Sequence, residues 1–204
     1  MAIKERKERE KQDMRNLIIE SATRLFLKQG YDKTSIRNIA EDIEYSPATI
    51  YLYFKDKDEI FYVIHENGFS MLLAEFRKSQ NIVNPFERLV AICKSYIRFA
   101  IENQDFYDLM FIMRAPLAEI ECNNEWPEGQ NAFAFLVQVI HECLDQQLIR
   151  PVDVGLQALS VWSMGHGLVS LYVRGRCTAM KFPEADMEQL LDDAVVNYLE
   201  AIRT

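Results

Sequence analysis

Apolar residues recur at helical spacing along almost the whole chain, and this periodicity restricts the fold more than any other feature. Near the N-terminus, one helical face carries Met14, Leu17, Ile18, Ala22, Leu25 and Phe26. No segment alternates with the period of a β-strand, and seven Gly and six Pro in 204 residues are compatible with long helices. We therefore predict an all-α fold of about nine helices, with an N-terminal three-helix domain and a larger C-terminal helical bundle.

Helix-ending residues divide the first sixty positions into three helices. Gly30 supplies a C-terminal stop for the first helix. A short second helix is expected at 36–43, where apolar residues follow the i, i+3, i+4, i+7 pattern. Ser46 and Pro47 are typical of an N-cap and a first helical position, so a third helix should run from there to about Phe54.

The rest of the chain is predicted to be a series of longer helices. Asp56 and Glu59 resemble a capping box that opens the fourth helix. The expected helices are 57–79, 84–103, 106–118 with a break near Pro116, one ending near 149, 151–173 and 183–202. We place a domain boundary before the fourth helix, which gives a domain at 1–56 and a second at 57–204.

The charge is unevenly distributed. The net charge is −8, yet residues 1–40 hold ten Lys and Arg against six Asp and Glu, whereas residues 61–204 hold eleven against nineteen. A mildly basic end on an acidic body is expected when only one end of a protein meets phosphate.

One apolar segment requires a membrane test. Residues 154–173 carry no formal charge over the length of a transmembrane helix. They also contain His166, Gln157, three serines and three glycines, which favours a helix buried in a soluble protein. The charged N-terminus does not resemble a signal peptide, and the four cysteines form no CxxC pair. We expect a cytoplasmic protein with no membrane association, no metal site and no cofactor.

Residues 34–57, which read TSIRNIAEDIEYSPATIYLYFKDK, have the spacing of a helix-turn-helix. The two short helices can pack through Ile39, Ala40, Ile43, Ile50 and Phe54. The second of them would then expose short or flat side chains, Pro47, Thr49 and Tyr51, that can reach base edges and phosphates in a major groove. An ordinary helical hairpin has the same spacing, so spacing alone leaves both interpretations open.

The stretch resembles the DNA-binding domain of the tetracycline-repressor (TetR) family of bacterial regulators. The resemblance covers about the first 60 residues and rests on Thr34-Ser35, Ile39-Ala40, Ser46, Tyr51-Leu52-Tyr53-Phe54 and Lys57. It implies that Thr34 and Ser35 cap the second helix and touch phosphate, and that Ser46 opens the third. It further implies that Pro47, Ala48 and Thr49 face bases, that Tyr51 and Tyr53 contact backbone or base edges, and that Lys57 meets phosphate.

The turn of the motif departs from the family pattern. The usual Ala-Gly-Val reads Ile43-Glu44-Tyr45 here, and Glu44 lacks the freedom of glycine at positive φ. A mildly strained turn is therefore expected, with an acidic side chain that repels phosphate. A Gly often found in the third helix is Ala48.

The C-terminal body offers a looser resemblance. Trp162, His166 and Gly167 are similar to a pattern in the C-terminal domain of one TetR subgroup. His166 could be a core histidine satisfied by a backbone carbonyl or a polar contact for an effector. We predict an effector pocket lined by Phe69, Phe106, Met110, Arg114, Phe133, Trp162 and His166, suited to a mostly apolar molecule with an acidic group.

These observations lead to a functional prediction. No nucleophile elbow or phosphate loop is present, so we do not expect an enzyme. We predict a homodimer formed through the last two helices that acts as a repressor and is released from a palindromic operator by a small apolar effector. The alternatives are a DNA-binding regulator controlled by a protein partner or by DNA architecture, and a helical lipid-binding module or enzyme.

Overall fold

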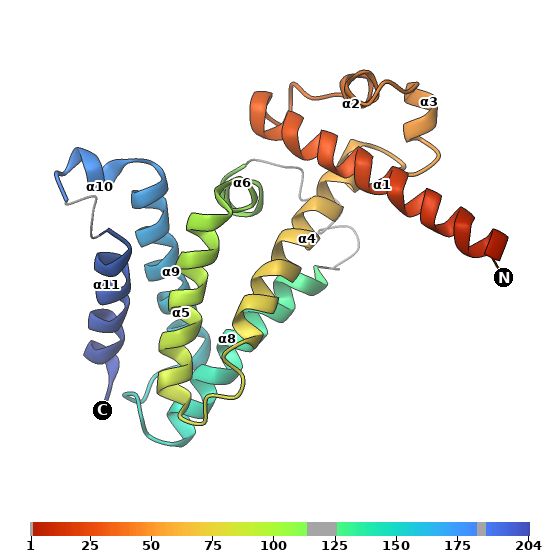
Figure 1. Ribbon diagram of the computed structural model, residues 1–204. Helices are drawn as coiled ribbons and strands as arrows, with labels where there is room; N and C mark the ends of the chain where they lie inside the picture. The colour runs from red at the N-terminus through yellow and green to blue at the C-terminus, as the bar shows by residue number, and fades with distance from the viewer. Residues whose placement is uncertain (1, 114–125, 183–186) are drawn as a thin grey trace. The chain divides into compact units, whose positions relative to one another are not determined.

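A computed structural model describes residues 2–113, 126–182 and 187–204, and the predicted all-α class is confirmed. Within these ranges the chain forms ten α-helices and one π-helical segment, with no β-strand (Figure 1). The helices fall into two compact units. The first comprises Met1–Gly68 and Asp105–Trp126, and the second Phe69–Gln104 and Pro127–Thr204.

The division between the units lies inside a helix. The fourth helix, α4 (Lys57–Arg77), contributes its first half to one unit and its second half to the other. The predicted functional boundary between residues 56 and 57 stays a prediction, because compactness alone does not define a domain's function.

The first unit is organised around a hydrophobic core to which several helices contribute fully buried side chains. It contains α1 (Ala2–Gln29), α2 (Ile36–Asp42), α3 (Pro47–Ile50), the start of α4, most of α6 (Gln104–Tyr107) and η1 (Asp108–Ile112). Ile18 and Phe26 from α1 are fully buried, as are Ile39 from α2 and Ile50 from α3. Phe54 is also buried, so the predicted packing of the two short helices is found in the structure.

The segment after α5 contains an unexpected turn. A helix was predicted at 106–118, but the chain is α-helical only at α6 and then π-helical in η1. The wider turn is closed by Met113, whose backbone N–H donates to the carbonyl oxygen of Asp108 at 2.8 Å. The predicted break at Pro116 lies outside the described residues.

This segment packs within the first unit. Leu109 belongs to its apolar core, and the Nε2 atom of buried His65 lies 3.1 Å from the carbonyl oxygen of Met110. The Met110 side chain covers Gly68 so closely that a Cβ atom there would lie 2.6 Å from its Sδ. Glycine at position 68 therefore permits a close approach of α4 to this segment.

The second unit is a helical bundle. It is built from α5 (Pro85–Glu102), α8 (Pro127–Asp145), α9 (Val154–Val173) and α11 (Met187–Ile202), with a short α10 (Arg176–Ala179) that was not predicted. α5 packs against α8, α9 and α11. Ion pairs reinforce two of these contacts, Arg88 with Glu142 and Lys94 with Asp192 at 3.1 Å. The predicted start of the last helix at Pro183 lies outside the described residues.

Several chemical features of the described ranges bear on function. None of their helices has the length and apolarity needed to cross a membrane. Cys93, Cys143 and Cys177 are free thiols, and burial raises the pKa of Cys93 to about 12. No group of His, Cys, Asp and Glu among these residues is arranged to hold a metal ion.

Candidate nucleic-acid interface

Side-chain caps fix the start of both short helices in the first unit. The Ser35 hydroxyl accepts a hydrogen bond from the N–H of Asn38 at 3.2 Å, and the Asn38 side chain accepts one from the N–H of Ser35. Ser46 caps α3 by accepting from the N–H of Thr49 at 3.3 Å, and Pro47 takes the first helical position. These caps satisfy backbone donors that would otherwise be unpaired, so α2 and α3 begin at defined residues.

The turn between α2 and α3 has the geometry that the sequence predicted. Glu44 has a φ of +60°, in the left-handed region. The N–H of Tyr45 donates to the carbonyl of Ala40 at 2.8 Å, and that of Glu44 donates to Glu41 at 3.2 Å. This pair of bonds is a Schellman motif, whose left-handed position favours glycine. A glutamate there costs roughly 1–2 kcal/mol of backbone strain.

The outward face of α3 presents small and flat side chains. Ser46, Pro47 and Ala48 are exposed, and just after the helix Tyr51 and Leu52 are 57% and 78% exposed. The opposite face is anchored by apolar side chains in the core, so the exposed face is held rigidly. Such a face fits the edge pattern of a major groove, because short side chains let the backbone approach the bases.

Two other predicted contacts of α3 are only partly accessible. Thr49 is half-buried, and its hydroxyl lies 3.0 Å from the Ser46 hydroxyl. Tyr53 is half-buried against the core. Both remain predicted DNA contacts.

One predicted contact residue is buried. Thr34 is 2% exposed, and its hydroxyl donates to the carbonyl of Gly30 at 2.9 Å. The prediction that Thr34 caps α2 is therefore wrong: Ser35 alone is the N-cap, and Thr34 closes the turn that follows α1. We do not retain Thr34 as a phosphate contact, because its side chain is out of reach.

Lys57 is engaged inside the first unit. Its ammonium donates to the carbonyl of Tyr31 at 2.8 Å and lies 3.8 Å from the centroid of the Tyr31 ring. Burial lowers the pKa of Lys57, while nearby Asp32 acts to raise it. These contacts hold the start of α4 against the turn after α1. The phosphate contact that the family pattern implied for Lys57 stays a prediction.

Sequence reasoning missed two basic residues near α3. Arg15 donates to the carbonyl of Tyr53 at 2.5 Å, and its guanidinium lies 4.1 Å from the centroid of the Phe54 ring. Lys55 follows directly, with a side chain 71% exposed and 3.6 Å from Asp56. The sequence signal for Lys55 was its position directly after Phe54, the last core residue of the motif, where the chain returns to the surface.

A polar network joins α1 to the end of α2. The Ser21 hydroxyl donates to Asp42 at 2.6 Å, and Arg24 forms an ion pair with the same carboxylate. The hydrogen bond from Ser21, followed by the contact with Arg24, lowers the pKa of Asp42. The orientation of the two-helix motif on α1 is thus fixed by polar as well as apolar contacts.

The predicted effector residues fall into separate groups. In the second unit, the rings of Phe133 and Trp162 lie 6.0 Å apart between centroids. The Nδ1 atom of His166 lies 3.3 Å from the hydroxyl of Tyr96. Both interpretations of His166 stay open. Burial lowers the pKa of His166. Tyr96, on α5, was missed because nothing in the local sequence links it to His166.

Two of the remaining members belong to the first unit. Phe106 and Met110 both approach Gly68 in the first unit. Phe69 is buried, and Arg114 lies outside the described residues. The effector pocket as a whole stays a prediction.

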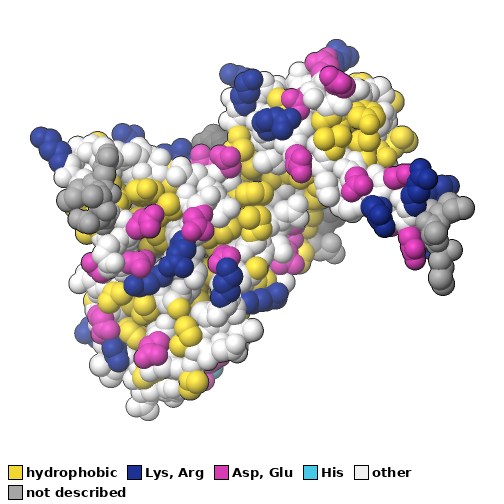
Figure 2. Space-filling model, viewed as in Figure 1, with side chains coloured by type: hydrophobic (Ala, Val, Ile, Leu, Met, Phe, Trp, Pro, Cys, Tyr) yellow, Lys and Arg dark blue, Asp and Glu magenta, His cyan; other side chains and the backbone are white. Residues whose placement is uncertain are grey.

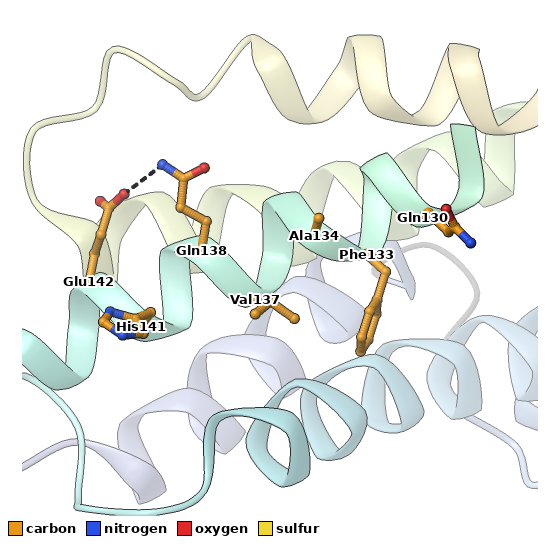
Figure 3. A pocket seen from close by; sticks show the side chains of 7 residues that line it. All are labelled: Gln130, Phe133, Ala134, Val137, Gln138, His141 and Glu142. Carbon is orange, nitrogen blue, oxygen red and sulfur yellow. Dashed lines mark hydrogen bonds between the residues drawn. The ribbon is translucent and has the colours of Figure 1, made fainter. Parts of the chain in front are cut away.

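A groove runs along α8 in the second unit (Figure 3). It is lined by residues of that helix only, namely Gln130, Phe133, Ala134, Val137, Gln138, His141 and Glu142. Gln138 donates to Glu142 at 3.0 Å, and His141 lies 3.0 Å from Asp145. Phe133 is its single member from the predicted pocket, so this groove is a strip of helix surface distinct from that pocket.

Large apolar side chains are exposed along the end of the chain. Leu156 and Leu159 on α9 are 57% and 52% exposed. Leu171, Met180, Phe182 and Leu190 are also exposed. Leu171 lies on α9 and Leu190 on α11, and Met180 and Phe182 follow α10 in the chain.

Comparison with known proteins identifies both parts of the chain. Residues 18–64 match the family model described as bacterial regulatory proteins, tetR family. Residues 89–198 match the model described as tetracyclin repressor-like, C-terminal domain. The second match alone covers more than half of the chain.

Individual relatives agree with these matches. The HTH-type transcriptional regulator HbdR of Aromatoleum sp. (strain CIB) is 38% identical over 79 residues, which cover 38% of this chain but only 34% of HbdR. IcaR of Staphylococcus aureus, named as a negative transcriptional regulator of the biofilm operon icaADBC, is 24% identical over 146 residues, 72% of this chain and 77% of IcaR.

A solved structure shows the same fold. The crystal structure of PfmR, a TetR family transcriptional regulator from Thermus thermophilus, has a TM-score of 0.70 at 23% identity, covering 90% of this chain and 97% of PfmR. With a capped helix-turn-helix in the first unit and family matches over both parts, the chain belongs to the tetR family of DNA-binding bacterial transcriptional regulators.

Proposed function

We propose that this regulator is a repressor that binds a palindromic operator as a homodimer and is released by a small, mostly apolar effector. The outward face of α3 carries the proposal. Ser46, Pro47, Ala48 and Tyr51 form a rigid, exposed surface of small and flat side chains. Such a surface suits direct contact with base edges and the adjoining backbone.

The exposed apolar side chains of the second unit support a homodimer. Leu156 and Leu159 lie three residues apart on one face of α9, and Leu190 is exposed on α11. Two copies related by a two-fold axis would cover these side chains in a four-helix interface. A two-fold dimer presents two copies of α3 related by the two-fold axis, and the operator should therefore be palindromic.

The aromatic pair of the second unit supports an apolar effector. Phe133 and Trp162 provide flat apolar surface, while His166 and Tyr96 provide polar atoms nearby. To release DNA, the effector must prefer the form that does not bind DNA, by a coupling of about 1–3 kcal/mol. Operator DNA must then weaken effector binding by the same factor, which gives the proposal a second, independent readout.

Binding-site selection tests the DNA part of the proposal. The full-length protein is incubated with a pool of random duplexes, and the bound fraction is amplified and sequenced. The expected result is an inverted repeat whose half-site centres are about 34 Å apart or somewhat more. Enrichment of single, unpaired half-sites would contradict the dimeric arrangement, and no enrichment would contradict sequence-specific binding.

A release screen tests the effector part. Aromatic and fatty compounds are screened for dissociation of the selected operator, and active compounds are then assayed on Trp162→Ala and His166→Ala. Release should require at least tenfold more compound with these variants, a loss of about 1.4 kcal/mol. Val83→Ala, at a position that is 91% exposed and outside the predicted pocket, is the control. Equal release from all variants would show that the pocket is elsewhere.

A further inference from the structure

We propose that the N-terminal part of α1 is a second DNA-contacting element, which follows the sugar–phosphate backbone beside the half-site read by α3. The inference rests on the proposed placement of α3 against DNA. The N-terminal family match begins at residue 18, so the family likeness assigns no role to the helical turns before it. In Figure 1, these turns of α1 extend beyond α3 and away from the rest of the first unit.

A basic stripe follows one face of this extension. We define it as Lys4, Lys7 and Lys11, which are spaced three and four residues apart and are all exposed. Residues at this spacing stack on one side of an α-helix. Continuing the same spacing leads to Arg15 and then to Ile18, which is fully buried. The face that packs α1 onto its unit therefore becomes basic toward the N-terminus.

Arg15 shows where this face is directed. Its guanidinium donates to the carbonyl of Tyr53 and lies over the Phe54 ring, immediately after α3. At 1.5 Å per residue, Lys11, Lys7 and Lys4 follow at about 6, 12 and 16 Å from Arg15 along the helix axis. The basic stripe thus continues, on the same side of α1, the surface that begins at the end of α3.

One acidic residue, Glu8, lies at the edge of the stripe, four residues after Lys4 and three before Lys11. Asp13 falls on the opposite side of the helix by the 3.6-residue period, and Glu5 lies between the two sides. Glu10 is paired with Arg6 at 2.7 Å on the flank. In Figure 2, blue basic and magenta acidic side chains are both visible at this end of α1. With three lysines and one glutamate, this face still presents mainly positive charge to phosphate.

The lysines of the stripe are not neutralised within the described part of the chain, where none of the three forms an ion pair. Like charges three or four residues apart destabilise a helix by about 0.2–0.5 kcal/mol per pair. A row of anions relieves that repulsion, and the backbone of duplex DNA is a regular row of anions. The stripe is a basic surface in a protein whose net charge is −8. The occupant that fits the stripe is therefore the DNA backbone flanking the half-site.

Phosphate contacts carry no sequence information, and this gives the proposal a specific signature. Loss of the stripe should weaken binding to every duplex and reduce its dependence on salt. Each lost phosphate contact lowers the slope of log K against log salt by about 0.9.

The test compares two double variants of the full-length protein by fluorescence anisotropy at several salt concentrations. Lys7→Gln with Lys11→Gln removes two charges from the stripe, and Arg6→Gln with Arg9→Gln removes two from the other side of the same helix. The stripe variant should lower the slope by about 1.8 per protomer, on the operator and on a scrambled duplex alike. The control should change it by less than about 0.5. Equal changes, or no change in either variant, would overturn the proposal.

Two further arms locate the contact and separate it from the reading helix. Extending the operator by about ten base pairs, one helical turn, on each side should strengthen binding by the parent but not by the stripe variant. If the stripe variant gains as much from the extension as the parent, the stripe does not contact flanking DNA. Tyr51→Ala is measured in parallel. If that variant binds the operator as the parent does, the placement of α3 fails, while the slopes on the scrambled duplex still decide the role of the stripe.

Discussion

The two compact units of this protein differ in how they dispose of their apolar side chains. The first unit encloses its own: Ile18, Ile39 and Ile50 are fully buried, and the large apolar side chains left exposed near α3 are few. The second unit buries a core beneath α5 but leaves Leu156 and Leu159 open along α9, among others nearby. The first unit is complete as a single copy, whereas the second presents an apolar surface that lacks a cover.

This difference shows what kind of partner each unit suits. Short side chains and a tyrosine on the outward face of α3 fit a polar groove lined by base edges. A row of leucines fits another apolar helix, because removing such surface from water is favourable in proportion to its area.

The largest effect is expected from charging the exposed leucines. Leu156→Lys with Leu159→Lys should weaken dimerisation at least about 100-fold, since each buried leucine contributes roughly 1.5–3 kcal/mol. Light scattering at micromolar concentration should report a monomer, and operator binding should fall in parallel. Val83→Lys, at a position that is 91% exposed and outside these helices, is the control. A dimer as stable as the parent's would place the interface elsewhere.

A smaller effect is expected from the reading helix. Tyr51→Ala should weaken operator binding by about 10- to 100-fold, because it removes a contact to the DNA backbone or a base edge. The side chain is more than half exposed, so the free energy of unfolding should change by less than about 0.5 kcal/mol. Anisotropy and urea unfolding separate the two quantities. A loss of stability with unchanged affinity would mean that Tyr51 is structural.

Buried His65 should make stability depend on pH. Burial lowers the pKa of His65 below its ordinary value of 6.5, and the contact with Met110 only partly opposes this. Below about pH 6.5 the unfolded chain therefore takes up a proton that the folded chain resists. The free energy of unfolding should fall by up to about 1 kcal/mol between pH 7.5 and 5.5.

Two histidine variants assign this pH dependence. His65→Gln should reduce the slope without abolishing it, because burial also lowers the pKa of His166. His141→Gln, at an exposed position, is the control. Urea unfolding at several pH values is the measurement. If the curve keeps its slope in His65→Gln, another group is responsible.

The smallest effect concerns the turn of the motif. Glu44→Gly should stabilise the first unit by about 0.5–1 kcal/mol, because glycine adopts a φ of +60° without the penalty of a side chain. Glu41→Gly is the matched control, since it places glycine inside α2, where it should destabilise by up to about 1 kcal/mol. Urea midpoints that move in the same direction for both variants would contradict the strain at Glu44.

The helix ends were predictable because the residues that create them act locally. Gly30 ends α1, Ser46 and Pro47 open α3, and Asn84 with Pro85 opens α5, all as the sequence indicated. In each case one side chain, or its absence, satisfies or frees a neighbouring backbone group. The π-helical turn was not predictable in this way, because it lies inside an apolar stretch with no comparable local signal.

The contacts of individual side chains were harder to predict. Whether Thr34 faces solvent or the carbonyl of Gly30 depends on how α1 packs on α2, which the local sequence does not specify. Lys57 was assigned to phosphate from its place in the family pattern, and nothing in the local sequence indicates its contact with Tyr31. Trp162 lies near Phe133 of α8, and His166 lies near Tyr96 of α5. These contacts between helices could not be derived from the spacing along one helix.

The π-helical turn has a consequence for building hybrid regulators. Leu109 and Met110, more than forty residues away from the start of α4, supply part of the core around His65. The first unit, which carries the helix-turn-helix, is therefore not a continuous piece of chain that can be cut out after α4. A hybrid that transfers only residues 1–68 would lose Leu109 and leave the carbonyl partner of His65 behind. To transfer the first unit intact, a hybrid needs two junctions, one in α4 and one before α6, so that both stretches of chain are included.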